Sequence, residues 1–168
     1  HDQTRRQRQM CIRDSKSVGF YEIAKIKYDS DIKDSLKNIL KAVDMKKNFP
    51  PYVKLHLEIT ATLNDKRNLK KLLKKYWSLN PSSLLRSIII KILNDNDLTD
   101  IKFINEIIKN NAGGEESKKL LIYFAIKNLK WDIARENVIG MIGSNPSKEI
   151  CYFMSDIELG ENNDKQKS

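Results

Sequence analysis

The side chains that could carry out chemistry are few in this chain of 168 residues, and they lie far apart. Its histidines are His1 and His56, its cysteines are Cys11 and Cys151, and none of them belongs to a CxxC or Cys/His cluster. A nucleophile needs a base within hydrogen-bond reach, and a zinc site needs several such ligands at close spacing. We therefore predict no enzymatic activity, no metal, no cofactor, and free thiols of the kind found in a reducing compartment.

Three further motifs have a structural interpretation that we favour over a functional one. His56 stands alone between two leucines, where a partly buried or groove-facing imidazole is more common than a metal ligand. Asp95 and Asp97 lack the glycine and the terminal glutamate of a calcium loop. Gly113 and Gly114 have neither a preceding strand nor the following Gly-Lys-Ser/Thr of a phosphate-binding loop. We interpret these motifs as one helix position and two turns.

Helices must position these residues, because the apolar side chains recur at helical spacing throughout the chain. The clearest stretch runs from Gly114 to Gly160 and is typical of three helices separated by short turns. Val53–Ile59 alternates as a strand would, but no second stretch could pair with it, so the predicted fold class is all-α. The predicted helices cover residues 17–28, 32–46, 51–63, 82–93, 99–110, 115–129 and 131–143, a segment around 69–76, and a last segment over 146–160.

The spacing of the prolines predicts a repeat. Pro51, Pro81 and Pro146 lie about 30 and then about 65 residues apart, so helix pairs recur roughly every 30–34 residues, the tetratricopeptide period. One such hairpin cannot bury its own apolar face, so neighbouring hairpins must stack. We predict a tetratricopeptide-like stack of antiparallel helical hairpins, an α-solenoid, over residues 16–160. The predicted structural repeat positions are Pro51, Trp77, Pro81, Ala125, Trp131, Ala134 and Pro146.

The two ends of the chain differ from this repeat region. Residues 1–15, HDQTRRQRQMCIRDS, have no apolar period and resemble the translation of a sequencing adapter. We predict that they are non-native or disordered, and the alternative is a basic arm that binds an acidic partner. After a turn over Gly160–Asp164, residues 161–168 are predicted to be a truncated polar tail.

The net charge of +9 limits the classes of partner. Nucleic-acid readers favour arginine because its planar fork pairs bidentately with phosphate and guanine. After residue 15 only Arg67, Arg86 and Arg135 remain, so a solvated lysine-rich surface is favoured over a basic RNA-binding α-solenoid, which stays as the alternative. The longest apolar run, Leu120–Ile126, is too short for a membrane span, and the polar N-terminus lacks the apolar core of a signal peptide.

The predicted hairpins also indicate where a partner would bind. In tetratricopeptide stacks the first helix of each pair lines the concave face, where peptides dock. Here those helices include residues 51–63 and 115–129. Helical spacing places Lys54 and Glu58 on this face in the first, and Lys119 and Tyr123 in the second. We predict that the lysines attract an acidic segment and that Tyr123 supplies an aromatic contact, although all four are also typical of an ordinary surface.

Three stretches resemble the C-terminal repeat region of HemY-type proteins, membrane-anchored tetratricopeptide proteins of bacterial haem biosynthesis. They are Ala42–Pro81 with its LLKKYW segment, Glu116–Arg135 with Ala125 and Trp131, and Pro146–Asp164 with its MSDIE segment. The resemblance covers about residues 17–164, but the paired N-terminal membrane helices of the family are absent from this sequence.

The resemblance implies a non-enzymatic protein-protein interaction scaffold. Its partners would include haem-biosynthesis enzymes, and its repeats would face the cytoplasm at the bacterial inner membrane, held there by an N-terminal anchor that this sequence lacks. This chain alone is expected to be a soluble fragment. The alternative is a generic tetratricopeptide adaptor unrelated to haem.

Overall fold

The computed structural model describes residues 2–144 and 146–168, and every regular element among them is helical. This confirms the prediction of an all-α fold. The chain divides into two compact units, residues 1–80 and residues 81–168. Each unit is described by itself below.

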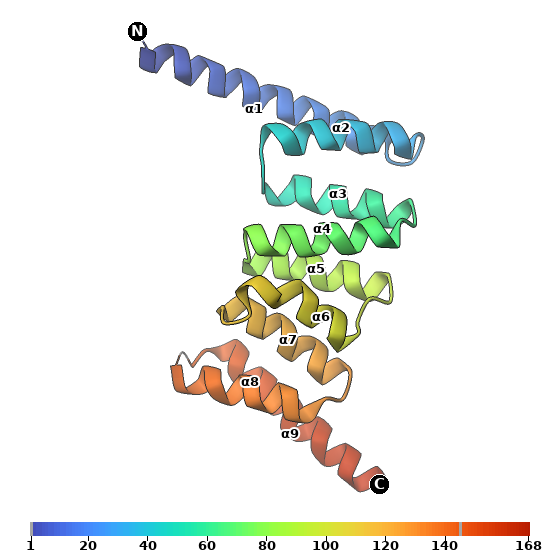
Figure 1. Cartoon of the computed structure of the whole chain (residues 1–168), viewed down its shortest axis with the longest axis vertical. Coiled ribbons are helices and arrows are strands. Elements are labelled where there is room, and N and C mark those ends of the chain that lie inside the picture. Colours follow the sequence, from blue (N-terminus) through green and yellow to red (C-terminus); the bar gives the residue numbers. More distant parts are fainter. Residues whose placement is uncertain (1, 145) are drawn as a thin grey trace. The chain divides into compact units, whose positions relative to one another are not determined.

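Unit 1 consists of four helices, each antiparallel to the one before it (Figure 1). They are α1 (Asp2–Lys27), α2 (Ile32–Met45), α3 (Pro50–Thr62) and α4 (Lys66–Leu79). The side chains of Asp31 and Asp65 accept hydrogen bonds from the first turns of α2 and α4, and Pro50 begins α3, where its missing N–H costs nothing. Between α1, α2 and α3 lies a buried apolar cluster of Ala24, Ile39, Ala42, Tyr52, Leu55 and Ile59.

The first half of α1 projects beyond α2 (Figure 1). Residues 2–15 are helical here, which differs from the disordered conformation that we expected. All of residues 2–16 are exposed, and packing against the rest of unit 1 begins at Ser17, whose hydroxyl lies 3.0 Å from Tyr52 Oη. An uncovered helical segment contributes little to stability. We therefore still predict that removing residues 1–15 leaves the stability of the fold unchanged.

Unit 2 is built around α7 (Glu115–Lys127). This helix packs against α5 (Ser83–Asp95), α6 (Ile101–Ile108), α8 (Trp131–Ser144) and α9 (Lys148–Lys167), and a short 3-10 helix, Lys109–Asn111, follows α6. The buried cluster between α7, α8 and α9 contains Ile122, Ala125, Ala134, Val138, Met141, Ile150, Phe153 and Ile157.

A left-handed residue follows each of three helices whose ends are regularly spaced along the chain. Asn64, Asp97 and Leu129 follow α3, α5 and α7 with φ of 57°, 55° and 56°, in the left-handed region. Beyond α5 and α7, an N–H bonds back across the turn to the third-last helical carbonyl, at 2.9 Å for Leu98 and 2.8 Å for Lys130. This is the Schellman pattern. These three residues lie about 33 and about 32 residues apart along the chain, and a fourth left-handed residue, Asn48 with φ of 58° after α2, lies outside this spacing.

The end of α9 differs from the predicted turn and polar tail, because the helix continues to Lys167. A Cβ atom at Gly160 would overlap the ring of Trp131, so only glycine allows this close approach. The indole Nε1 of Trp131 donates to Asp164 Oδ2 at 2.8 Å, and Arg135 pairs with Glu158 and Glu161. Residues 160–164 therefore form a helical contact with α8, and glycine here serves packing instead of a turn.

Candidate functional site

The predicted partner-binding residues of unit 1 line a shallow groove. Its volume is about 300 Å³, and it lies between α1, the turn that follows it, and α3. Lys54 and Glu58 face it from α3, as the helical spacing predicted for a shared surface. The groove is lined by Tyr21, Lys25, Tyr28, Asp29, Pro51, Lys54, Leu55 and Glu58.

The aromatic side chains of the groove are held in place by unit 1 itself. The Tyr21 ring packs on Tyr52 with 4.9 Å between centroids, and Tyr28 Oη lies 2.7 Å from Thr62 Oγ1. The Lys25 ammonium sits 4.7 Å from the centroid of the Tyr21 ring, within cation–π range. Rigid tyrosines offer apolar contact area to a ligand at little cost in conformational entropy.

The charges of the groove are accessible to solvent. Lys54 Nζ is 3.9 Å from Glu58 Oε1, and the lysine side chain keeps 53 % of its surface exposed. An exposed pair at this distance contributes little to stability, so its charges are available to a partner. The groove can therefore receive an extended segment that carries charges of both signs beside apolar groups.

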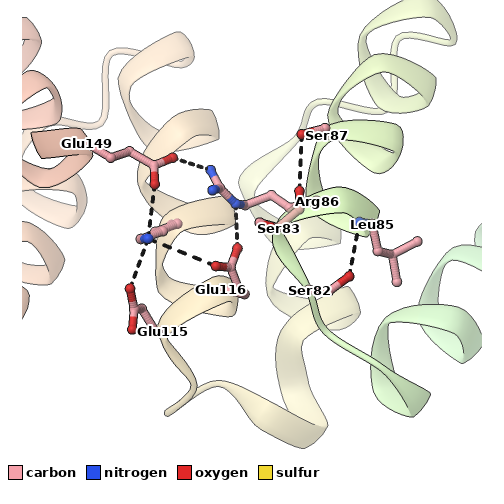
Figure 2. Close-up of polar contacts among 9 residues, drawn as sticks. Ser82, Ser83, Leu85, Arg86, Ser87, Glu115, Glu116 and Glu149 are labelled. Atoms are coloured by element: carbon pink, nitrogen blue, oxygen red, sulfur yellow. Dashed lines mark hydrogen bonds and ion pairs between the residues drawn. The ribbon is translucent and has the colours of Figure 1, made fainter. Parts of the chain in front are cut away.

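Lys119 of unit 2 has a different environment from the one expected. It is only 7 % exposed, and its Nζ lies 2.9 Å from Glu115 Oε1, 3.0 Å from Glu149 Oε2 and 4.0 Å from Glu116 Oε1. Figure 2 shows the guanidinium of Arg86 between Glu116 and Glu149, at 2.7 Å and 2.6 Å. The sequence prediction of a lysine free to attract an acidic partner is therefore corrected, because three carboxylates of its own chain surround it.

These contacts define an ion-pair network, which consists of Arg86, Glu115, Glu116, Lys119 and Glu149 and joins α5, α7 and α9. Burial lowers the pKa of Lys119, but Glu115 and Glu149 outweigh it and hold the pKa above the ordinary value. Burial likewise raises the pKa of Glu149, and hydrogen bonds from Arg86 and Lys119 reverse this and hold it below the ordinary value. Arg86, Lys119 and Glu149 therefore stay charged near neutral pH. We therefore interpret the network as a structural clamp, that is, a set of ion pairs that holds α5, α7 and α9 together.

Tyr123, the fourth predicted binding residue, is half-buried. Asn94 donates a hydrogen bond to its Oη at 3.2 Å, and its ring meets Phe124 edge-on. Its hydroxyl therefore fixes α5 to α7 within unit 2, which leaves less of the side chain for a partner.

The predicted repeat positions lie in the helices and at their starts. Trp77, Ala125 and Ala134 are fully buried, and Trp131 covers Gly160. Pro51 lies in the first turn of α3. Pro81 and Pro146 each precede a serine, Ser82 or Ser147, that caps the next helix.

One buried pair was not apparent from the sequence. His56 is 5 % exposed, and its Nδ1 lies 2.7 Å from the hydroxyl of Tyr76. Burial, with a smaller contribution from Lys75, lowers the pKa of His56 to about 4, and burial raises the pKa of Tyr76 to about 12. The imidazole is therefore neutral at pH 7. No local pattern links residues on two helices, so the sequence offers no signal for this pair.

Residues 2–144 and 146–168 contain no group of three or more His, Cys, Asp or Glu side chains placed to hold a metal ion. Within the same residues, no helix combines the length and the apolarity that crossing a bilayer requires. No protein-family model matches the chain, and no curated protein matches it.

Proposed function

We propose that this chain is a non-enzymatic scaffold, built from tetratricopeptide-like helical hairpins, that binds a protein partner. The left-handed residues Asn64, Asp97 and Leu129 support the repeat, since their spacing of about 33 residues is close to the tetratricopeptide period. These residues follow α3, α5 and α7, which are the first helices of successive pairs in this proposal.

The observation that carries the binding function is the groove between α1 and α3. It joins two anchored tyrosines to an exposed Lys54–Glu58 pair, and both helices are first members of their pairs. Peptides dock on this face in repeats of this type. The partner is a segment with at least one acidic residue opposite Lys54 and apolar residues over the tyrosine rings.

The resemblance to HemY-type proteins extends the proposal. On that basis the partner is an enzyme of haem biosynthesis, and the repeats act on the cytoplasmic side of the bacterial inner membrane. A generic adaptor with no link to haem would use the same groove. The identity of the captured protein therefore distinguishes the haem-associated scaffold from the generic adaptor.

Capture from a bacterial membrane extract tests the groove. The Lys54→Ala/Glu58→Ala variant should retain less than about a tenth of the partner, because a loss of about 1.4 kcal/mol already lowers affinity tenfold. Its matched control is Lys91→Ala/Asp95→Ala, which removes another exposed pair of the same spacing from α5. Equal helicity by circular dichroism and equal capture by the two variants would remove the groove from the proposal.

A second candidate is RNA binding, which one observation favours. Helix α4, KRNLKKLLKKYWSL, carries six basic residues and no acidic one. Binding that rests on phosphate contacts falls steeply with salt concentration. A generic single-stranded RNA should then bind the chain at low salt and dissociate between 50 and 200 mM. Absence of RNA binding at low salt excludes this candidate.

A further inference from the structure

A second pocket lies in unit 1, away from the residues of the groove. It has a volume of about 480 Å³, within the range of small-molecule sites. Its walls come from the last turns of α2 and α4, the turn after α2, and one residue of α3. The lining residues are Leu40, Val43, Asp44, Lys47, Asn48, His56, Lys75, Tyr76 and Leu79.

The second ring nitrogen of His56 reaches this pocket. Among the described residues, every fully buried side-chain nitrogen or oxygen has a hydrogen-bond partner. Nδ1 is paired with Tyr76, whereas the described residues provide no hydrogen-bond partner for Nε2, so Nε2 cannot be fully buried. The residue as a whole is 5 % exposed and lines the pocket. We infer that Nε2 is exposed to this pocket.

The Tyr76 hydroxyl decides which proton His56 carries. The imidazole is neutral at pH 7, so only one of its nitrogens bears a hydrogen. The 2.7 Å contact between the hydroxyl and Nδ1 is compatible with two tautomers of His56, and we adopt the one in which the hydroxyl donates to Nδ1. The hydrogen of the imidazole is then on Nε2. The pocket receives a neutral N–H donor whose direction is set by Tyr76.

The remaining walls combine positive charge with exposed aliphatic surface. Lys75 is near enough to His56 to act on it electrostatically, and Lys47 lines the same pocket. Asp44 opposes these two cations and leaves an excess of one positive charge. Leu40 and Leu79, which are 46 % and 55 % exposed, give the pocket an aliphatic side. One end of a ligand would thus be anionic and the other apolar.

We propose that this pocket binds a carboxylate that is attached to a short aliphatic chain. The His56 Nε2–H and the Lys75 ammonium hold the carboxylate, and Leu40, Val43 and Leu79 cover the chain. Charge-assisted hydrogen bonds to a carboxylate are about twice as strong as neutral ones, and the leucines gain by losing contact with water. This site is independent of the partner groove, so either can fail without the other.

The experiment uses hexanoate as the probe and the whole chain labelled with ¹⁵N. Hexanoate should shift the His56 side-chain resonances and saturate, while hexanamide and hexylammonium should bind at least fivefold more weakly. A short peptide that ends in a free leucine carboxylate tests the second source of the same chemistry. Stronger binding of the peptide assigns the pocket to a protein C-terminus, and stronger binding of hexanoate assigns it to a free acid.

Matched variants locate the binding. Lys75→Gln should weaken hexanoate at least fivefold, whereas Lys71→Gln, one turn earlier on α4 and outside the pocket, should leave it unchanged. Asp44→Asn should strengthen binding, because it removes the opposing charge. Tyr76→Phe should weaken binding while helicity is retained, because Nδ1–H becomes an alternative tautomer. The proposal is overturned if hexanoate and hexanamide bind equally, or if the two lysine variants behave alike.

Discussion

The two units bury polar side chains in opposite ways. Unit 1 buries His56 against Tyr76 and keeps both uncharged, while its lysine of α3, Lys54, stays in solvent. Unit 2 buries Lys119, leaves 11 % of the Arg86 side chain exposed, and surrounds both cations with carboxylates. Lys54 and Lys119 occupy the same place, four residues after the start of α3 and α7.

The difference between these lysines shows what determines whether a lysine at a given helix position is exposed or buried. Within its own helix, Lys54 has Glu58 four residues later, and Lys119 has Glu115 and Glu116 four and three residues earlier. What buries Lys119 is α9, whose Glu149 approaches within 3.0 Å. A contact between residues about 30 apart, and not the local pattern, therefore decides whether a lysine is a binding group or part of a clamp.

The largest expected effect is the response of unit 1 to acid. The pKa of His56 is about 4 in the folded chain against 6.5 when exposed, so the unfolded state binds more protons between these values. Stability is therefore complete above about pH 6.5 and falls as the pH drops to about 4. The loss is about 3 kcal/mol, at about 1.4 kcal/mol for each pH unit of difference. Urea unfolding from pH 7 to pH 4 measures it.

The two tryptophans separate the units in this experiment. Trp77 lies in unit 1 and Trp131 in unit 2, so Trp131→Phe leaves fluorescence that reports unit 1 alone, and Trp77→Phe reports unit 2. The pH dependence between 6.5 and 4.5 should appear with Trp77 and disappear in His56→Gln. The pKa of Glu149 is held below its ordinary value of 4.5, so its contribution is present above about pH 4.5 and is lost below it. Equal acid sensitivity of both units above pH 4.5 would contradict the comparison.

Removal of Glu149 should have the next largest effect. Glu149→Ala leaves Arg86 and Lys119 without one shared partner, and a buried cation that loses its partner is costly. Since the Glu149 side chain is 39 % exposed, solvent screens part of this loss, and we expect about 2 kcal/mol. The control is Asp156→Ala on the exposed face of α9, which should change the free energy of unfolding by less than about 0.5 kcal/mol. Equal urea midpoints for both variants would show that the network stabilises nothing.

The sequence predicted those parts of the fold that depend on local pattern. Apolar spacing located the helices, and Ser82 and Ser147 after their prolines are recognisable caps. The prediction failed at Gly160, because a glycine followed by polar residues is typical of a turn and only the approach of Trp131 makes it a helical contact. The prediction that Lys119 is available to a partner failed for the same reason, because Glu149 approaches it from another helix. Of the candidate site, helical spacing could place Lys54 and Glu58 on one face, but the tyrosines opposite come from another helix.

The two equivalent lysines provide a direct test of the comparison. Lys119→Ala should destabilise the chain by about 1–2 kcal/mol, because it leaves Glu115, Glu116 and Glu149 close together with Arg86 as their remaining cation. Lys54→Ala should cost less than about 0.5 kcal/mol, since an exposed pair contributes little. Chemical denaturation of the two variants at low and high salt measures both values. A larger effect for Lys54 would reverse the assignment of the two roles.

The smallest effect concerns the turn that both units share. Asn64 and Leu129 hold the same left-handed conformation after α3 and α7, with φ of 57° and 56°. Asparagine tolerates this region, whereas leucine is strained there by its Cβ atom. Leu129 is also 58 % exposed, so its side chain contributes little packing that a substitution would remove.

Leu129→Asn should therefore raise the free energy of unfolding by about 0.5–1 kcal/mol, and the reciprocal Asn64→Leu should lower it by a similar amount. Thermal denaturation of the two single variants and of the variant that carries both substitutions measures these changes. If the turns are equivalent, the double exchange restores the original stability, and a loss in both single variants would mean that the side chains, and not the shared backbone conformation, determine these positions.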